Sequence, residues 1–392
     1  MNHSALINKA KSYLTAQNLI VLLAVSSFAP FVFSIIALLV AFICIVANPK
    51  LQKGLFSFRG AFLIPLFCAY SFLVAFFNNN VLGMLASFGF FVILTIFCFS
   101  RSFITKEAFD TSLSAVLFMV YPAVITAIVE LFTQNEKSQL VYRCASYFFN
   151  ANYFGALMAA AVIICAYRIV ETRGKSIFYF LTTIFGLIGV YLSGSLFAIM
   201  EIAVGITVYL ILSRHYRLLC LVVILGSLAL LLVSSMPSLL PRLAEAAETT
   251  EYRIRIWGVA IREIQARPLF GSGFLSYNQV YKLYEGSFET AHCHNLFLDS
   301  MLNFGIVGTS LLIAMFYFVL KRVVVCFKAE RSYVSILILS LIFAVLSHCF
   351  TDITFFWVQT GVFYVILLGG IGCEERRLGK DNDLLIRGRF RI

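Results

Sequence analysis

The polar segment 292–295, His-Cys-His-Asn, stands directly before a long apolar run. Asn295 is a typical helix N-cap, so we expect His294 to lie just outside the N-terminus of a transmembrane helix. The partial positive charge of that terminus favours a neutral imidazole, and a neutral imidazole can act as a general base near pH 7. His294 is therefore the candidate catalytic base, and His292 is a supporting candidate.

Two glycines follow His294 at a helical spacing. Gly305 and Gly308 stand eleven and fourteen residues after it, and at about 100° per residue both would share its helix face. Small residues on that face would let a second helix approach closely and hold the histidine in place. A surface histidine above an ordinary packing face explains the same spacing, so both interpretations stay open.

A zinc site is a second interpretation of His292 and His294. Zinc takes three or four protein ligands, and no third or fourth ligand occurs at a usual spacing. The stretch Gly271-Ser272-Gly273 does not predict a nucleotide site, because no strand precedes it and no Gly-Lys-Ser/Thr follows. We therefore expect neither a metal nor another cofactor.

Further ionisable residues lie in or near apolar runs, where such residues are functional candidates. His348 and Asp352 are four residues apart at an outer membrane edge, a spacing at which they could hydrogen-bond each other. Glu201 and Asp299 are also candidates. Glu130 lies within about one turn of the outer surface, where snorkelling alone would explain it.

The composition requires a membrane environment. The chain has 392 residues, of which 61% are hydrophobic and 12% charged, while a soluble domain carries about twice that charged fraction. The mean hydropathy is +0.93, and continuous apolar runs recur that are long enough to cross about 30 Å of hydrocarbon. Such runs do not alternate as β-barrel strands do.

We therefore expect an all-α polytopic membrane protein, one integral membrane domain over residues 1–392, with about twelve transmembrane helices. The first two are split at Pro30, although one kinked span over 18–47 would fit and would invert the N-terminus. The predicted spans are 12–29, 31–48, 60–77, 81–100, 108–132, 152–169, 176–192, 194–212, 218–235, 296–320, 332–349 and 354–371.

Lysine and arginine in the short loops indicate the orientation. With both termini cytoplasmic, most of the 30 Lys and Arg residues face inward. The net charge of +11 then reflects topology and predicts no nucleic-acid partner. The basic cytoplasmic tail, 372–392, is expected to lie against anionic lipid. Ten cysteines occur without a CxxC pair, so no disulfide framework is predicted.

Two long outer loops remain, at about 133–151 and 236–293, the second between the ninth and tenth spans. Loops of this length usually have a function. The pattern over 251–266 predicts an amphipathic helix whose apolar face is Trp257, Ala260, Ile261 and Ile264. Arg255 and Arg262 lie on its polar side, Glu251 can pair with Arg255, and Arg143 occupies the first loop. Arginine can bind a phosphate group bidentately, and contact with lipid headgroups explains these arginines equally well.

The segment His294-Asn295, nine residues and Gly305-Ile306-Val307-Gly308 matches the H-[N/S/Q]-x9-G-x-x-G signature. In this the chain resembles the superfamily of O-antigen ligases and Wzy-type polymerases. Arg255-Ile256-Trp257, followed by residues 268–273, and Arg143, followed by Asn150-Ala151-Asn152, are also similar to segments of that family. One departure is visible: many members carry Ser-Arg after a glycine near the outer end of a middle span, and here Gly194-Ser195 is followed by Leu196.

The resemblance implies a metal-independent glycosyltransferase at the outer face of the cytoplasmic (inner) membrane. Its donor would be an oligosaccharide on undecaprenyl pyrophosphate, and its acceptor a glycan hydroxyl. His294 would take the acceptor's proton, and Arg143 and Arg255 would bind the pyrophosphate. The supporting candidates are His292, Asn295, Arg262, His348 and Asp352, and Gly305 and Gly308 would be structural.

Two acceptors fit this chemistry. A polymerase, which we favour, would extend another lipid-linked repeat, with a chain-length regulator or flippase as candidate protein partner. A ligase would transfer the glycan to a lipid A core or another acceptor. Outside this class, a lipid-linked glycan flippase is the alternative. A structural membrane protein would leave the outer ionisable residues without a role.

Overall fold

The computed structural model describes residues 15–133, 143–173, 176–243, 245–285 and 287–381, and over these residues the regular secondary structure is entirely helical. A helix occupies each of the twelve predicted spans. These helices are α2 (Ala16–Ser26), α3 (Phe31–Ala47), α5 (Leu63–Phe77), α6 (Val81–Phe103), α7 (Lys106–Thr133), α8 (Ala151–Glu171), α9 (Ile177–Ser193), α10 (Leu196–Leu212), α11 (Tyr216–Ser235), α14 (Leu296–Glu330), α15 (Tyr333–His348) and α16 (Val358–Gly369).

Five helices among the described residues are long and apolar enough to cross a membrane: α6, α7, α8, α11 and α14. Six further apolar helices, α2, α3, α5, α9, α10 and α15, have 10–17 residues. The predicted split at Pro30 is confirmed, because α2 ends at Ser26 and α3 begins at Phe31 with Pro30 as its N-cap. Proline has no N–H to donate, so it suits the start of a helix.

Helix α8 forms the centre of the bundle. Nearly all of its side chains are buried, including the run Ala159-Ala160-Ala161. Small side chains let neighbouring helices approach closely, and α9, α10 and α15 all pack against α8. The N-terminus of this central helix therefore supplies a rigid platform at one end of the bundle.

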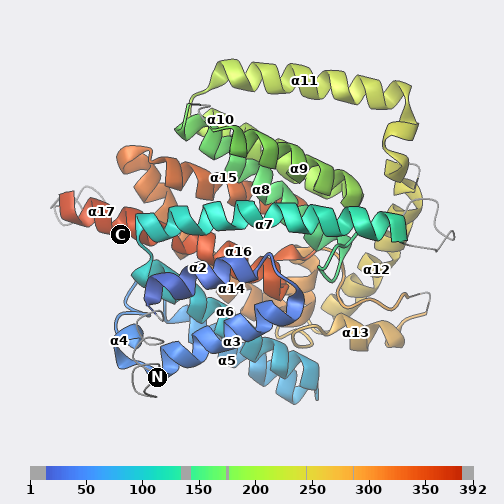
Figure 1. Ribbon diagram of the computed structural model, residues 1–392. Coiled ribbons are helices and arrows are strands. Elements are labelled where there is room, and N and C mark those ends of the chain that lie inside the picture. The colour runs from blue at the N-terminus through green and yellow to red at the C-terminus, as the bar shows by residue number, and fades with distance from the viewer. Residues whose placement is uncertain (1–14, 134–142, 174–175, 244, 286, 382–392) are drawn as a thin grey trace, which may run out of the picture.

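Helix α11 contrasts with α8, because none of its residues is buried. Figure 1 shows it at the top of the view, outside the other helices. Its exposed apolar side chains fit a helix surrounded by lipid. It leads into the predicted second loop.

The second predicted loop is folded. It contains the short 3₁₀-helices η1 (Pro237–Leu239) and η2 (Pro241–Leu243), then α12 (Ala246–Ala266), α13 (Tyr277–Val280) and η3 (Tyr281–Leu283). Helices α12 and α13 gather at one end of the bundle, while α4 (Pro49–Gln52) and α17 (Ile371–Asp381) lie at the other (Figure 1). Of the predicted basic tail, residues 382–392 lie outside the described residues.

The predicted helix over 251–266 is confirmed as α12, but its buried face differs by one position. Ile256, Val259 and Ala260 are buried, whereas Ile261 is exposed. The cause is the buried carboxylate of Glu263, which accepts hydrogen bonds from Ser272 Oγ at 2.7 Å and Tyr284 OH at 2.9 Å. With these bonds Glu263 occupies the buried face of α12, and the predicted face residues Trp257 and Ile264 are only half-buried.

Helix α14 is interrupted at Gly305, whose φ of 60° and ψ of −169° are not helical. Backbone of the segment 268–273 satisfies the groups freed there, as a break within an apolar bundle requires. Ile306 N donates to Pro268 O at 2.9 Å, and Gly273 N donates to Asn303 O at 2.9 Å. A Cβ at Gly305 would lie 2.4 Å from Leu269 O, so only glycine fits.

This break corrects the prediction that Gly305 and Gly308 share the helix face of His294, because a rotation of about 100° per residue does not continue through it. Gly308 still marks a close approach. A Cβ there would lie 2.3 Å from the ring of Tyr70 on α5, and the Tyr70 hydroxyl donates to Phe304 O at 2.7 Å.

Candidate functional site

His294 occupies a sharp turn directly before α14. Its φ is +52°, a left-handed conformation that side-chain-bearing residues rarely adopt and that often occurs at functional sites. The predicted N-cap is confirmed, because Asn295 Oδ1 accepts from Phe297 N and Leu298 N, both at 3.0 Å. His294 therefore lies just outside the helix N-terminus.

The neighbouring residue Cys293 fixes this turn from both sides. Its backbone N–H donates to Asp299 Oδ1 at 3.1 Å, and Asp299 lies in the first turn of α14. Its carbonyl accepts from Trp257 Nε1 at 3.0 Å, so α12 is attached to the same turn. Cys293 and Asp299 are buried, which shields both hydrogen bonds from water and holds the histidine backbone in place.

The loop after α15 is joined to the same turn. Leu296 N donates to Cys349 O at 2.9 Å, and Asn295 Nδ2 donates to Phe350 O at 2.9 Å. These bonds bring Asp352, far away in the sequence, against the histidines.

Asp352 is the charge at the centre of the site. Its Oδ1 lies 3.5 Å from His294 Nδ1 and 3.7 Å from His292 Nε2, and its side chain is buried. It accepts hydrogen bonds from Asn152 Nδ2 at 2.5 Å and Ile353 N at 2.8 Å. Burial acts to raise the pKa of Asp352, but His294 and His292 outweigh burial and hold it well below its ordinary value. Asp352 is therefore ionised.

The two histidines have different roles in this geometry. The His294 backbone N–H donates to His292 Nδ1 at 3.2 Å, so the His292 proton belongs on Nε2, which faces Asp352 and lies 3.4 Å from Tyr153 OH. Burial, the main cause, lowers the pKa of His292 to about 4. His292 is thus neutral near pH 7.

His294 Nδ1 faces Asp352 without hydrogen-bond geometry and has no hydrogen-bond partner among the described residues. The carboxylate favours a proton on that nitrogen. The lone pair of His294 Nε2 is then available to accept a proton from another molecule.

Arg143 reaches the same carboxylate through Asn152. Asn152 Oδ1 accepts a hydrogen bond from Arg143, while Asn152 Nδ2 donates to Asp352. Arg143 Nε also donates to Ser193 O at 3.0 Å, and its aliphatic stem lies against Gly194. Burial, followed by the charge of Arg242, lowers the pKa of Arg143 to about 10, so the side chain remains a cation at neutral pH.

Glu130 positions the loop that carries Arg143. Its carboxylate accepts from Ala145 N at 3.2 Å and Ser146 N at 2.7 Å, and Ser146 has a left-handed φ of 55°. The interpretation of Glu130 as a merely snorkelling side chain is therefore wrong. Residues 134–142 of this first loop lie outside the described residues.

Arg253 is a cation that sequence reasoning missed. Its guanidinium lies 5.3 Å from the centre of the Phe197 ring. Burial lowers the pKa of Arg253, Asp352 acts to raise it and Arg242 acts to lower it. The charges of Arg242, Asp352 and Arg253 also act on the pKa of Arg143, so these four groups interact electrostatically. The helical periodicity of α12 could have placed Arg253 on the side of the helix that faces the bundle. The predicted apolar face was shifted by one position, so Arg253 was not considered.

The predicted Arg255 and Arg262 lie on the exposed side of α12. Arg255 pairs with Glu251 at 2.5 Å, as predicted, and its side chain is 53% exposed. Arg262 lies 4.9 Å from the Tyr284 ring centre. The contacts of these two side chains thus do not join them to Asp352.

His348 makes a different contact from the one predicted. Its Nδ1 lies 2.8 Å from Glu201 Oε2, and Tyr364 OH donates to Glu201 Oε1 at 3.1 Å. The spacing of His348 and Asp352 predicted a hydrogen bond only for a continuing helix, and α15 ends at His348. His348 still contributes to the low pKa of Asp352.

The atoms of His292, His294 and Asp352 that could ligate a metal ion lie within 4.8 Å of one another. Asp352 is therefore a candidate third metal ligand, which the sequence spacing did not reveal because only the fold brings it close to the histidines. However, Asp352 already accepts two hydrogen bonds, and the cations Arg143 and Arg253 share its surroundings. Nearby positive charge disfavours a divalent cation, whereas it suits an anionic ligand.

A comparison with known families finds that residues 181–313 match the family described as O-Antigen ligase. The matched region runs from α9 through α12 into α14 and includes Arg253, His294 and Gly305. Arg143 and Asp352 lie outside it. No curated protein matches the chain.

Proposed function

We propose that the chain is a member of the O-antigen ligase and polymerase superfamily and transfers a glycan from undecaprenyl pyrophosphate to a sugar hydroxyl, at the outer face of the cytoplasmic membrane. The match of residues 181–313 to the family described as O-Antigen ligase supports this proposal. The observation that carries this proposal is the connected row Arg143, Asn152, Asp352 and His294. In this row hydrogen bonds connect the cation of Arg143 to Asp352 through Asn152, and the candidate base His294 lies 3.5 Å from the same carboxylate.

In the proposed reaction, His294 Nε2 accepts the proton of the acceptor hydroxyl as its oxygen attacks the anomeric carbon. A new C–O bond forms, and the bond from that carbon to the pyrophosphate oxygen breaks. The electron pair leaves with undecaprenyl pyrophosphate, and attack from the opposite side inverts the anomeric centre. Asp352 stabilises the imidazolium that forms, as a carboxylate does in other base–carboxylate pairs.

The leaving pyrophosphate gains negative charge, which preorganised cations stabilise best in a site shielded from water. We assign this role to Arg143 and Arg253, because both guanidinium groups interact electrostatically with Asp352. Arg253 lies over Phe197, directly after Leu196, the position where many family members carry an arginine. Arg255, at the exposed side of α12, would meet the donor's pyrophosphate only at the rim of the site.

The first experiment decides whether the site is catalytic. Purified protein and lipid-linked oligosaccharide are incubated, and product glycans are separated by size. His294→Ala should abolish transfer while the protein stays folded and inserted, and transfer at the parental rate would show that His294 is not the base. Chelation of divalent cations should leave the rate unchanged, and restoration of a lost rate by added metal would require a metal at His292, His294 and Asp352.

The same transfer assay identifies the acceptor, because it shows which acceptor molecule must be supplied before product forms. A product ladder from lipid-linked repeats alone supports the polymerase that we favour. Transfer only after a lipid A core or another acceptor is supplied identifies a ligase. Movement of lipid-linked glycan across a vesicle membrane, without any new glycosidic bond, would replace both with a flippase.

A further inference from the structure

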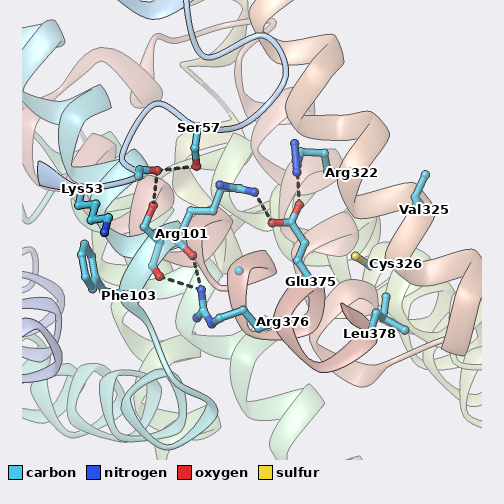
Figure 2. A pocket seen from close by; sticks show the side chains of 13 residues that line it. Lys53, Ser57, Arg101, Phe103, Arg322, Val325, Cys326, Glu375, Arg376 and Leu378 are labelled. Atoms are coloured by element: carbon cyan, nitrogen blue, oxygen red, sulfur yellow. Dashed lines mark hydrogen bonds and ion pairs between the residues drawn. The ribbon is translucent and has the colours of Figure 1, made fainter. Parts of the chain in front are cut away.

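A polar cavity lies at the opposite end of α14 from His294. It has a volume of about 460 Å³ and is walled by the connection before α5, the end of α6, the late part of α14 and α17 (Figure 2). Its charged lining residues are Lys53, Arg101, Arg322 and Arg376 against the single carboxylate of Glu375. The lining therefore carries a positive excess.

Glu375 does not use up the hydrogen-bonding capacity of the cations. It pairs with Arg101 at 2.6 Å and with Arg322 at 2.5 Å, so one carboxylate serves two guanidinium groups. Figure 2 shows both side chains converging on it. Arg101 Nε is buried and has no hydrogen-bond partner among the described residues. A buried N–H without an acceptor is costly, and an anionic oxygen in the cavity would satisfy it.

Arg376 attaches the wall formed by α17 to the end of α6. Its guanidinium donates to Arg101 O at 2.8 Å and to Ser102 O at 2.9 Å. These carbonyls belong to the last turn of α6, where they have no partner within the helix. The cavity is therefore built from fixed walls, not from a cluster of freely moving surface cations.

An apolar groove neighbours the basic cavity at Phe58 and extends along α14 as far as Leu296 and Phe297. It has a volume of about 470 Å³, and its lining includes Phe58, Leu94, Val319 and Leu368. Phe58 joins the two spaces: its ring lines the groove and lies 4.5 Å from the Arg101 guanidinium and 5.5 Å from that of Arg322. A ligand that fits both spaces carries an anionic group at one end and hydrocarbon at the other.

We propose that the basic cavity binds the phosphate group of an anionic phospholipid, with an acyl chain in the adjoining groove. The cavity is walled in part by α17, which lies at the opposite end of the bundle from α12 (Figure 1), and Trp257 of α12 is hydrogen-bonded to the turn that carries His294. The two sites therefore lie at opposite membrane faces, and the phospholipid belongs to the leaflet opposite the candidate catalytic site. A free phosphate ion would leave the groove unused.

The test uses the full-length protein in a neutral detergent. Native mass spectrometry follows binding of phosphatidylglycerol, phosphatidylcholine or inorganic phosphate. We expect phosphatidylglycerol to bind preferentially, and Lys53→Gln and Arg322→Gln each to weaken it about fivefold, the effect of removing one cation near an anionic headgroup. Glu375→Gln, which removes the competing carboxylate, should keep or strengthen binding.

Lys328→Gln is the matched control, because Lys328 is exposed on the same helix and does not line the cavity. It should bind phosphatidylglycerol like the parent. Equal affinity for phosphatidylcholine, or unchanged affinity in Arg322→Gln, would refute the proposal. Inorganic phosphate that binds as tightly as phosphatidylglycerol would also refute it, because the groove would then contribute nothing.

Discussion

Replacement of Asp352 by asparagine tests the centre of the proposed mechanism. The substitution keeps the shape of the side chain and removes its charge. Asp352 Oδ1 lies 3.5 Å from His294 Nδ1, and two unit charges at that distance interact by about 5 kcal/mol at an effective dielectric constant of about 20. Arg143 and Arg253 oppose part of this field, so we expect a loss of about 2–4 kcal/mol in transition-state stabilisation, or roughly thirty- to a thousandfold in kcat.

The assay measures glycan transfer under saturating donor, together with donor binding at equilibrium. Asp352→Asn should lower kcat and leave donor affinity the same or higher, because one negative charge near the proposed pyrophosphate site has been removed. Asp299→Asn is the contrasting variant, since its carboxylate holds the Cys293 backbone and does not pair with a histidine ring within 4 Å. A parental kcat in Asp352→Asn would contradict the reasoning, and so would a loss confined to donor affinity.

Three further predictions follow from the site and its supports. Arg253→Gln should weaken donor binding at least tenfold more than Arg255→Gln, because Arg253 interacts with Asp352 whereas Arg255 pairs with Glu251. Equal effects of the two substitutions on the donor Kd would show that Arg255 also binds the pyrophosphate. The pKa of His292 is lowered to about 4, so between about pH 6.5 and 4 the unfolded chain binds more protons at this residue, and stability should fall as the pH falls, by up to about 1.4 kcal/mol per pH unit. His292→Gln should flatten this part of the melting-temperature profile, and an unchanged profile would show that burial does not hold His292 neutral. Gly305→Ala should destabilise the protein by about 3 kcal/mol or more, because its Cβ would clash with Leu269 O at a left-handed φ, whereas Gly258→Ala, with open space around its Cβ, should change the melting temperature little.

Periodicity and hydropathy were sufficient to predict the helices. Long apolar runs specify helices regardless of their neighbours, since a backbone in hydrocarbon must satisfy its own hydrogen bonds. The split at Pro30 and the N-cap at Asn295 were also predictable, because each depends on a local backbone property. Which side chains of α12 are buried was not predictable from the sequence. Glu263 is buried because Ser272 and Tyr284, which follow α12 in the chain, donate hydrogen bonds to its carboxylate.

The candidate site was only partly visible in the sequence. His294 and Arg143 stood out by residue type and position, and Asp352 was a supporting candidate, but its contact with both histidines arises from the loop after α15. The break at Gly305 was hidden for a similar reason: the pattern around it is helical, and the hydrogen bonds that permit the break come from residues 268–273. Long-range partners of this kind leave no periodic signal in a single sequence.

The position of Asp352 near the end of the chain has a consequence for biogenesis. The proposed base, His294, lies before α14, whereas the carboxylate of Asp352 follows α15 in the chain. A nascent chain that stops after α14 would thus contain the whole histidine–glycine signature and still lack the carboxylate that lies 3.5 Å from His294. In the proposed mechanism, the formation of α15 and of the loop after it would therefore complete the site, and a chain without them would not transfer glycan.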